Sequence, residues 1–195
     1  MSITAKNLDD IERKIMEERA ELIDGQVVYK ALPGGEHASM AYSLGLAVGP
    51  FSRRKRDDGT GGWWILSEPT ILYRKLRESG QKLIADLAGW RRDRCPERPK
   101  GYPIQIRPDW VCEVCHSTRK KDTTIVPETL AAEGVSWYWF LDVEAENLMV
   151  YELSQEGFVL RKSLFREDGK VRIPPFDAIE LSMPVLLGDD PEDDE

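Results

Sequence analysis

The sequence predicts an α/β domain in which one central mixed β-sheet is flanked by helices. Runs of aliphatic, aromatic and β-branched residues recur along the chain, as buried strands require. One segment of helical character precedes the central runs, and another follows them. The 195 residues, 41% hydrophobic and 32% charged, have an ordinary globular composition and are enough for one core. We therefore expect a single domain over residues 1–187.

The first quarter of the chain is predicted to hold two helices and a hairpin. Residues 8–20 suit a short amphipathic helix. ELIDGQVVYKAL (21–32) is typical of a β-hairpin, with Asp24 and Gly25 as its two-residue turn. After a Pro-Gly-Gly break, EHASMAYSLGLAVGPF (36–51) is expected to be a helix that ends at Gly49 and Pro50.

The remainder is predicted to be mostly strands. Three central strands are expected at 63–74, 81–92 and 106–117, separated by loops with glycine and charged residues. A helix should run from Lys120 to Glu133 and stop at Gly134, and further strands follow at 136–143, 147–153, 158–165 and 171–176. The expected architecture is thus a restriction-endonuclease-like mixed sheet with an N-terminal hairpin and additional C-terminal strands.

Charge and cysteine content narrow the class of protein. No apolar run approaches the length of a membrane helix and no secretory signal is visible, so we expect a cytoplasmic protein without membrane contact. Cys112 and Cys115 form a C-x-x-C without a second ligand pair. In a strand they would point to opposite faces, so buried thiols are favoured over a zinc or redox site.

The charges are unevenly distributed along the chain. The net charge is -8, but the last eight residues, GDDPEDDE, contain six of the 35 acids and no base. We expect this segment, 188–195, to be a disordered acidic tail. Bases cluster at 53–56, 91–100 and 119–121, where they could contact DNA phosphates. Solvated loop charge is the alternative explanation.

Two predicted strands interrupt an apolar run with a carboxylate: Asp86 in LIADLAGW and Glu113 in WVCEVCH. Buried carboxylates are unfavourable unless they are paired, hydrogen-bonded or bound to a metal. On neighbouring strands both could hold a divalent cation, and Mg²⁺ (or Mn²⁺) with one or two carboxylates can activate water against a phosphodiester. Glu68 in WILSEPTIL is a third candidate metal ligand. Structural pairing with Arg or Lys is the alternative.

ELIDGQVV, LIADLAGWRR, PDWVCEVCHSTRKKD and EGVSWYWFLD occur in an order that resembles the Uma2 family of restriction-endonuclease-like proteins, part of the PD-(D/E)XK nuclease-like superfamily. The resemblance covers residues 15–187, and PD-x-x-x-EV-x-x-ST is its most specific piece. It implies a sheet flanked by helices and a Mg²⁺-dependent DNA endonuclease, often dimeric. Asp86 and Glu113 would be the first and second metal-binding acids.

The lysine of this superfamily is missing from its usual places. Cys115 stands two residues after Glu113, and Val126 stands where relatives often carry a lysine in the next helix. Lys82 is one candidate replacement, because period-two spacing places it on the strand face of Asp86. Lys120 or Lys121, folding back from the helix start, is another.

His37 and Glu21 match positions at which the family tends to carry those residue types. His37, in the first turn of its helix, could reach the acids as a base or metal neighbour. A hydrogen-bonded helix residue is the alternative for His37, and a surface ion pair is the alternative for Glu21.

Three functions follow from these residues. The first is a Mg²⁺-dependent DNA endonuclease, acting as a homodimer, with Asp86, Glu113, Lys82 and His37 as catalytic residues. The second is a catalytically impaired relative that binds nucleic acid or protein. The third, a small-molecule hydrolase with two carboxylates, would need a roomy pocket.

Overall fold

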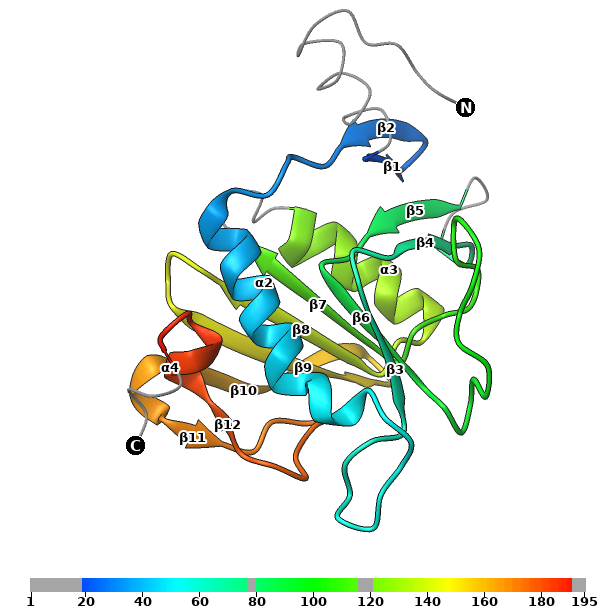
Figure 1. The fold of residues 1–195 in the computed structure, drawn as a ribbon. Coiled ribbons are helices and arrows are strands. Elements are labelled where there is room, and N and C mark those ends of the chain that lie inside the picture. Colours follow the sequence, from blue (N-terminus) through cyan, green and yellow to red (C-terminus); the bar gives the residue numbers. More distant parts are fainter. Residues whose placement is uncertain (1–18, 77–79, 116–120, 191–195) are drawn as a thin grey trace, which may run out of the picture.

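The computed structural model describes residues 19–76, 80–115 and 121–190 (Figure 1). Most of the helix expected at 8–20 lies outside these ranges, and so do all of the tail residues 191–195. The elements are β1 (Ala20–Ile23), β2 (Gln26–Tyr29), α2 (Gly35–Val48), η1 (Gly49–Phe51), β3 (Trp63–Ser67), β4 (Thr70–Tyr73), β5 (Gln81–Ile84), β6 (Leu87–Arg91), β7 (Trp110–Cys115), η2 (Lys121–Ile125), α3 (Val126–Glu133), β8 (Trp137–Asp142), β9 (Asn147–Ser154), β10 (Gly157–Phe165), η3 (Arg166–Asp168), β11 (Lys170–Val171), β12 (Leu181–Ser182) and α4 (Met183–Leu186).

The larger sheet has six strands in the order β10-β9-β8-β7-β6-β3. Strands β7 and β8 are parallel and are joined through η2 and α3, whereas the other pairs in this sheet are antiparallel. Helix α2 covers one face and α3 the other, as Figure 1 shows. The mixed sheet flanked by helices that the sequence predicts is therefore confirmed.

The smaller sheet has four strands in the order β2-β1-β5-β4 and contains the predicted hairpin. Asp24 and Gly25 both have positive φ, 48° and 78°, as a two-residue hairpin turn of the primed type requires. The hairpin joins the rest of this sheet through the pairing of Leu22 with Lys82. The turn chemistry was thus predictable, but the docking of the hairpin is a long-range event.

Two of the predicted central strands are each divided in two. The run 63–74 breaks at Glu68, whose φ is 46°, and the run 81–92 breaks at Ala85 and Asp86. The two breaks face each other, because the Glu68 amide donates to the Asp86 carbonyl at 2.9 Å. The antiparallel ribbon therefore leaves the six-stranded sheet here and continues in the four-stranded one.

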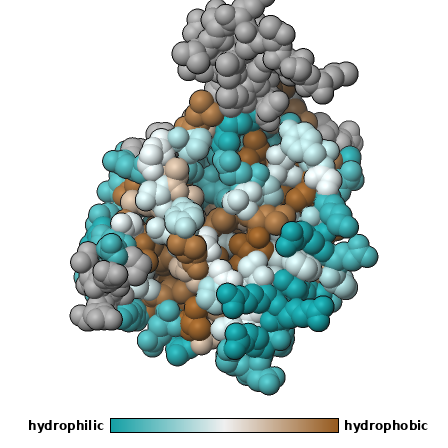
Figure 2. Space-filling model, viewed as in Figure 1, coloured by the Kyte–Doolittle hydropathy of each residue, from teal (hydrophilic) through white to brown (hydrophobic). Residues whose placement is uncertain are grey.

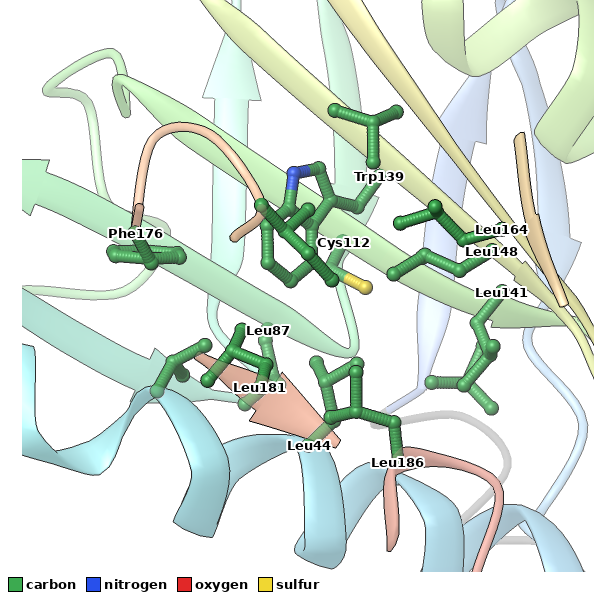
Figure 3. Packing of buried hydrophobic residues seen from close by; sticks show 14 of the residues in the cluster. Leu44, Leu87, Cys112, Trp139, Leu141, Leu148, Leu164, Phe176, Leu181 and Leu186 are labelled. Atoms are coloured by element: carbon green, nitrogen blue, oxygen red, sulfur yellow. The ribbon is translucent and has the colours of Figure 1, made fainter. Parts of the chain in front are cut away.

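The core lies on both faces of β7, whose side chains alternate between them. Trp110, Cys112 and Val114 pack on the α2 side, and Val111 and Cys115 pack on the α3 side. On the α2 side Phe176 contacts four aromatic rings at centroid distances of 4.9–5.6 Å, and Figure 3 shows it with neighbours from several elements. Cys112 and Cys115 form no disulfide and are buried on opposite faces, as expected for structural thiols.

The C-terminal part departs from the prediction in one respect. The strands at β8, β9 and β10 form as expected, but the run 171–176 contributes only its first residue, in the two-residue strand β11. Phe176 instead lies buried in the core, and the short helix α4 follows. Among the described residues, no helix is long and apolar enough to cross a membrane.

Candidate active site

Asp86 lies at the point where the ribbon separates from β7. Strand β6 pairs with β7 only as far as Leu87 with Cys112. One residue earlier, at Asp86, a side chain takes the place of the backbone acceptor: the Val114 amide donates a hydrogen bond to Asp86 Oδ2 at 2.7 Å. This bond fixes a buried carboxylate at the start of an opening between the two strands.

Glu113 faces the same opening from β7. Its side chain is 3% exposed and lies on the α3 face of the sheet, one strand away from Asp86. Both acids line a cleft of about 480 Å³ together with the segment 30–37, Lys121 and Asp122. In Figure 1 the start of α2, the end of β7 and the start of α3 meet at this end of the sheet, below the β1–β2 hairpin.

Lys30 supplies the positive charge that the sequence analysis did not locate. It follows β2 directly, and its Nζ lies 2.7 Å from Asp86 Oδ1 and 3.3 Å from Glu113 Oε2. The same ammonium donates to the Ile84 carbonyl at 2.8 Å. Three contacts from a side chain that is 12% exposed hold this lysine between the two acids.

His37 also reaches Asp86, as the sequence analysis proposed. The imidazole Nε2 lies 3.3 Å from Asp86 Oδ1, the oxygen that Lys30 contacts. His37 stands in the first turn of α2, so the helix orients the ring toward the cleft. The two residues therefore share one carboxylate oxygen.

The pKa values of the two acids are shifted in opposite directions. Burial alone would raise the pKa of Asp86, but the His37 hydrogen bond and the Lys30 charge outweigh it and hold that pKa well below its usual range. Burial, reinforced by the Asp86 charge and opposed by Lys30, raises the pKa of Glu113 well above its ordinary value. Burial would lower the pKa of Lys30, and the two carboxylates raise it instead. The site therefore combines an ionised acid, a cation and a second acid that resists ionisation.

A second ion pair stands behind these residues. Glu21 is buried on β1, where its Oε1 accepts the Ile84 amide at 2.9 Å and its Oε2 lies 3.0 Å from Lys121 Nζ. Lys121 also lies 3.6 Å from Asp122 Oδ1. Glu21 is thus in a buried pair and not in the surface pair that was its alternative. The pair joins the hairpin to the start of η2.

Two predicted site residues lie elsewhere. The bend at Ala85 and Asp86 breaks the period-two relation, and Lys82 Nζ lies 5.9 Å from the Tyr102 ring centroid instead of beside the acids. Glu68 turns outward at its positive φ, is 47% exposed and pairs with Arg19 at 2.8 Å. Neither residue lines the cleft.

The two other candidate lysines, Lys120 and Lys121, have different outcomes. Lys120 lies outside the described residues, and Lys121 lines the cleft but pairs with Glu21. Cys115 and Val126, at the usual lysine positions, are buried in the core on the α3 face.

The donor set fits a hard divalent cation bound by few protein ligands. Within the described ranges no three His, Cys, Asp or Glu side chains converge in a metal-binding cluster. Asp86 and Glu113 are nevertheless two buried carboxylates that contact the same ammonium, that of Lys30. Mg²⁺ is commonly held by one or two carboxylates, with water and substrate phosphate completing its shell. These two residues match that requirement.

Comparisons with known proteins identify the family and the fold. The family described as "Putative restriction endonuclease", Uma2, matches residues 8–185. The chain belongs to the Uma2 family. No functionally curated protein matches it. A crystal structure from Anabaena variabilis, described as a "putative nuclease belonging to DUF820", aligns with a TM-score of 0.68 and 19% identity over 94% of this chain and 98% of that chain. This similarity confirms the restriction-endonuclease-like fold of the Uma2 chain.

Proposed function

We propose that this Uma2 protein is a Mg²⁺- or Mn²⁺-dependent endonuclease that hydrolyses phosphodiester bonds in DNA. The observation that carries the proposal is the convergence of Asp86, Glu113 and Lys30 in one cleft. Two acids and a lysine are the groups that the superfamily uses, here with the lysine supplied by the hairpin. The family and the fold agree with this function.

Asp86 Oδ1 and Glu113 Oε2 are the atoms that would hold the metal. The bound cation would lower the pKa of a water molecule and neutralise phosphate charge. Lys30, freed from part of its pairing, would orient the attacking water and stabilise charge on the phosphoryl oxygens. His37, bonded to Asp86, would position that carboxylate and is placed to accept a proton.

Arg19 adds a substrate contact at the rim of the cleft. Its Nη2 pairs with Glu68, but its Nε is buried without a hydrogen-bond partner among the described residues. The Arg19 guanidinium nevertheless lines the cleft, and its charge and planar donors match a phosphate group. This supports a phosphodiester as the molecule that enters the cleft.

The catalytically impaired alternative rested on the missing lysine. Cys115 and Val126 cannot replace that residue, and both are buried. Lys30 provides the charge from another element, so the sequence departure no longer argues against catalysis.

The proposal includes the remaining expectations from the sequence: one catalytic domain, a cytoplasmic location and a homodimer. Strand β2 is an edge strand whose Val27, Val28 and Tyr29 are 61%, 40% and 51% exposed. An exposed apolar edge without charges favours pairing with a second chain.

Metal binding and plasmid cleavage test the function together. We expect wild-type protein to bind Mg²⁺ or Mn²⁺ in calorimetry and to nick supercoiled plasmid in its presence. Glu113→Gln should lose both, whereas Glu156→Gln, which removes an exposed acid outside the cleft, should keep both. Binding and cleavage that survive in Glu113→Gln would refute the proposed site. Absence of both from the wild type would refute the enzymatic function.

A further inference from the structure

A group of basic side chains lies at the end of the sheet opposite the cleft. Arg54 and Lys55, in the loop 52–62, and Arg92, after β6, line a hollow of about 720 Å³; we call these three residues the basic end. The loop projects at the bottom of Figure 1, and Figure 2 shows hydrophilic side chains gathered at that end. Six residues of extended chain separate Asp86 from Arg92, which corresponds to roughly 20 Å.

Acids also line this hollow, but each has a cation of its own. Asp93 pairs with Arg91, Asp109 lies 2.7 Å from Arg94 Nε, and Glu152 lies 2.7 Å from Arg161 Nε. Within the ranges that the structure describes, the three residues of the basic end form no ion pair at contact distance with an acid, although the charge of Lys55, after the Arg91 contacts, helps to lower the pKa of Asp93. The hollow therefore carries an uncompensated positive charge.

Arg92 is held rigidly in this arrangement. Its guanidinium carbon lies 3.5 Å from the Trp64 ring centroid, its Nε donates to the Trp63 carbonyl at 2.9 Å, and its Nη2 donates to the Ser52 carbonyl at 3.3 Å. The pKa of Arg92 is lowered, mainly by desolvation and to a smaller extent by the neighbouring charges of Arg54 and Arg98. A fixed guanidinium among like charges is unfavourable by itself and favourable when an anion binds.

Backbone bonds hold the two basic segments together. The Gly62 amide donates to the Arg53 carbonyl at 2.7 Å, and the Arg92 amide donates to the Gly62 carbonyl at 2.8 Å. Gly61 has a φ of +77°, and a Cβ there would collide with the Arg54 carbonyl. The glycines thus allow the loop to fold tightly against the end of β6, so the cations are preorganised by the fold.

We infer that the basic end binds phosphates of the nucleic-acid substrate at a distance from the bond that is cut. This inference rests on the proposed function and names a second contact surface for the same substrate. Successive phosphates of one strand rise by about 3.4 Å along the duplex axis, so a contact roughly 20 Å along that axis from the acids corresponds to a position about six nucleotides away. The guanidinium groups and the lysine match phosphate in charge and in hydrogen-bonding geometry.

The salt dependence of DNA binding tests this surface. Each phosphate contact contributes about 0.9 to the slope of log K against log salt concentration, so Arg54→Gln/Lys55→Gln should reduce that slope by about 1.8. Binding would be measured by fluorescence anisotropy on a labelled duplex of about 24 base pairs, in EDTA so that no cleavage occurs. Thermal unfolding would establish that each variant is folded.

Arg74→Gln/Lys75→Gln is the matched control. It removes the same two residue types from an exposed Arg-Lys pair on the other sheet, after β4. The control should keep the wild-type slope. An equal reduction in both variants would show a bulk charge effect and overturn the inference, as would no reduction in either.

Cleavage separates this inference from the proposed function. If the wild type cleaves plasmid and the Arg54→Gln/Lys55→Gln slope is unchanged, the surface fails and the function stands. If the wild type neither binds nor cleaves DNA, both fail.

Discussion

Replacing Lys30 by methionine should lower the unfolding free energy of the metal-free protein and raise its affinity for a divalent metal. Methionine keeps an unbranched side chain of similar length but removes the ammonium from between Asp86 and Glu113. The two carboxylates are then buried without their shared cation, a condition that a divalent metal would relieve. The same change should abolish cleavage, because the charge beside the reacting phosphate is lost.

The distances set the size of the effect. The ammonium lies 2.7 Å from the ionised Asp86, which at an effective dielectric constant of about 20 gives roughly 6 kcal/mol of Coulomb attraction. The attraction to Glu113, at 3.3 Å, reaches roughly 5 kcal/mol only when that acid is ionised. Desolvation of the three groups offsets most of this, and breaking a buried pair typically destabilises by about 3 to 5 kcal/mol. Since about 1.4 kcal/mol is tenfold in affinity, relief of a penalty of this size should let metal bind Lys30→Met on the order of 100- to 1000-fold more tightly.

Urea unfolding and calorimetry measure the two halves of this prediction. In EDTA, Lys30→Met should lose about 3 to 5 kcal/mol of unfolding free energy, and Mn²⁺ at about 100 times its Kd should return roughly 2.7 kcal/mol. Lys82→Met is the matched control, because Lys82 lies over Tyr102 and should change neither quantity by more than about 1 kcal/mol. Equal stability of Lys30→Met and wild type in EDTA, or weaker metal binding by the variant, would contradict this role of Lys30.

Three further predictions concern stability. Glu113 has a folded-state pKa above its unfolded value, so ionisation of Glu113 destabilises the fold as pH rises. In EDTA, the unfolding free energy of Glu113→Gln, measured with urea, should exceed that of wild type by on the order of 1 kcal/mol at pH 8 and by less at pH 4.5. A gain that does not depend on pH would contradict this. Phe176→Ala empties the space among four aromatic rings and should lose about 3 to 5 kcal/mol, against under about 1 kcal/mol for exposed Phe165→Ala. Gly61→Ala should lose roughly 1 to 3 kcal/mol by collision with the Arg54 carbonyl, while Gly35→Ala, with open space around it, should not.

Local chemistry explains why much of the fold was predictable. The Asp24 and Gly25 turn, the helix α2 and the alternation along β7 each depend on a few neighbouring residues. The breaks at Glu68 and Asp86 were missed because the residues on both sides are apolar and β-prone. Periodicity cannot show where a ribbon passes from one sheet into another, although a polar residue inside each run was the available signal.

In the candidate site, too, the residues with a local sequence signal were predicted, and the residue that depends on long-range packing was not. Asp86 and Glu113 were found because a carboxylate inside an apolar strand needs a chemical reason. Lys30 was missed because 56 and 83 residues separate it from the two acids, and only the docking of the hairpin joins them. The sequence signal for Lys30 was weak: a lysine that directly follows the apolar strand β2, at the start of the segment that leads to α2.

The position of a bound metal is the most direct test of the proposed site, because it requires no knowledge of the substrate. Crystals soaked in Mn²⁺ and measured at a wavelength with anomalous signal should show a peak at about 2.0 to 2.3 Å from carboxylate oxygens of both Asp86 and Glu113, with Lys30 Nζ moved from at least one of them. A peak at other residues, or an undisturbed contact between Lys30 and both acids at saturating Mn²⁺, would contradict a metal-dependent site.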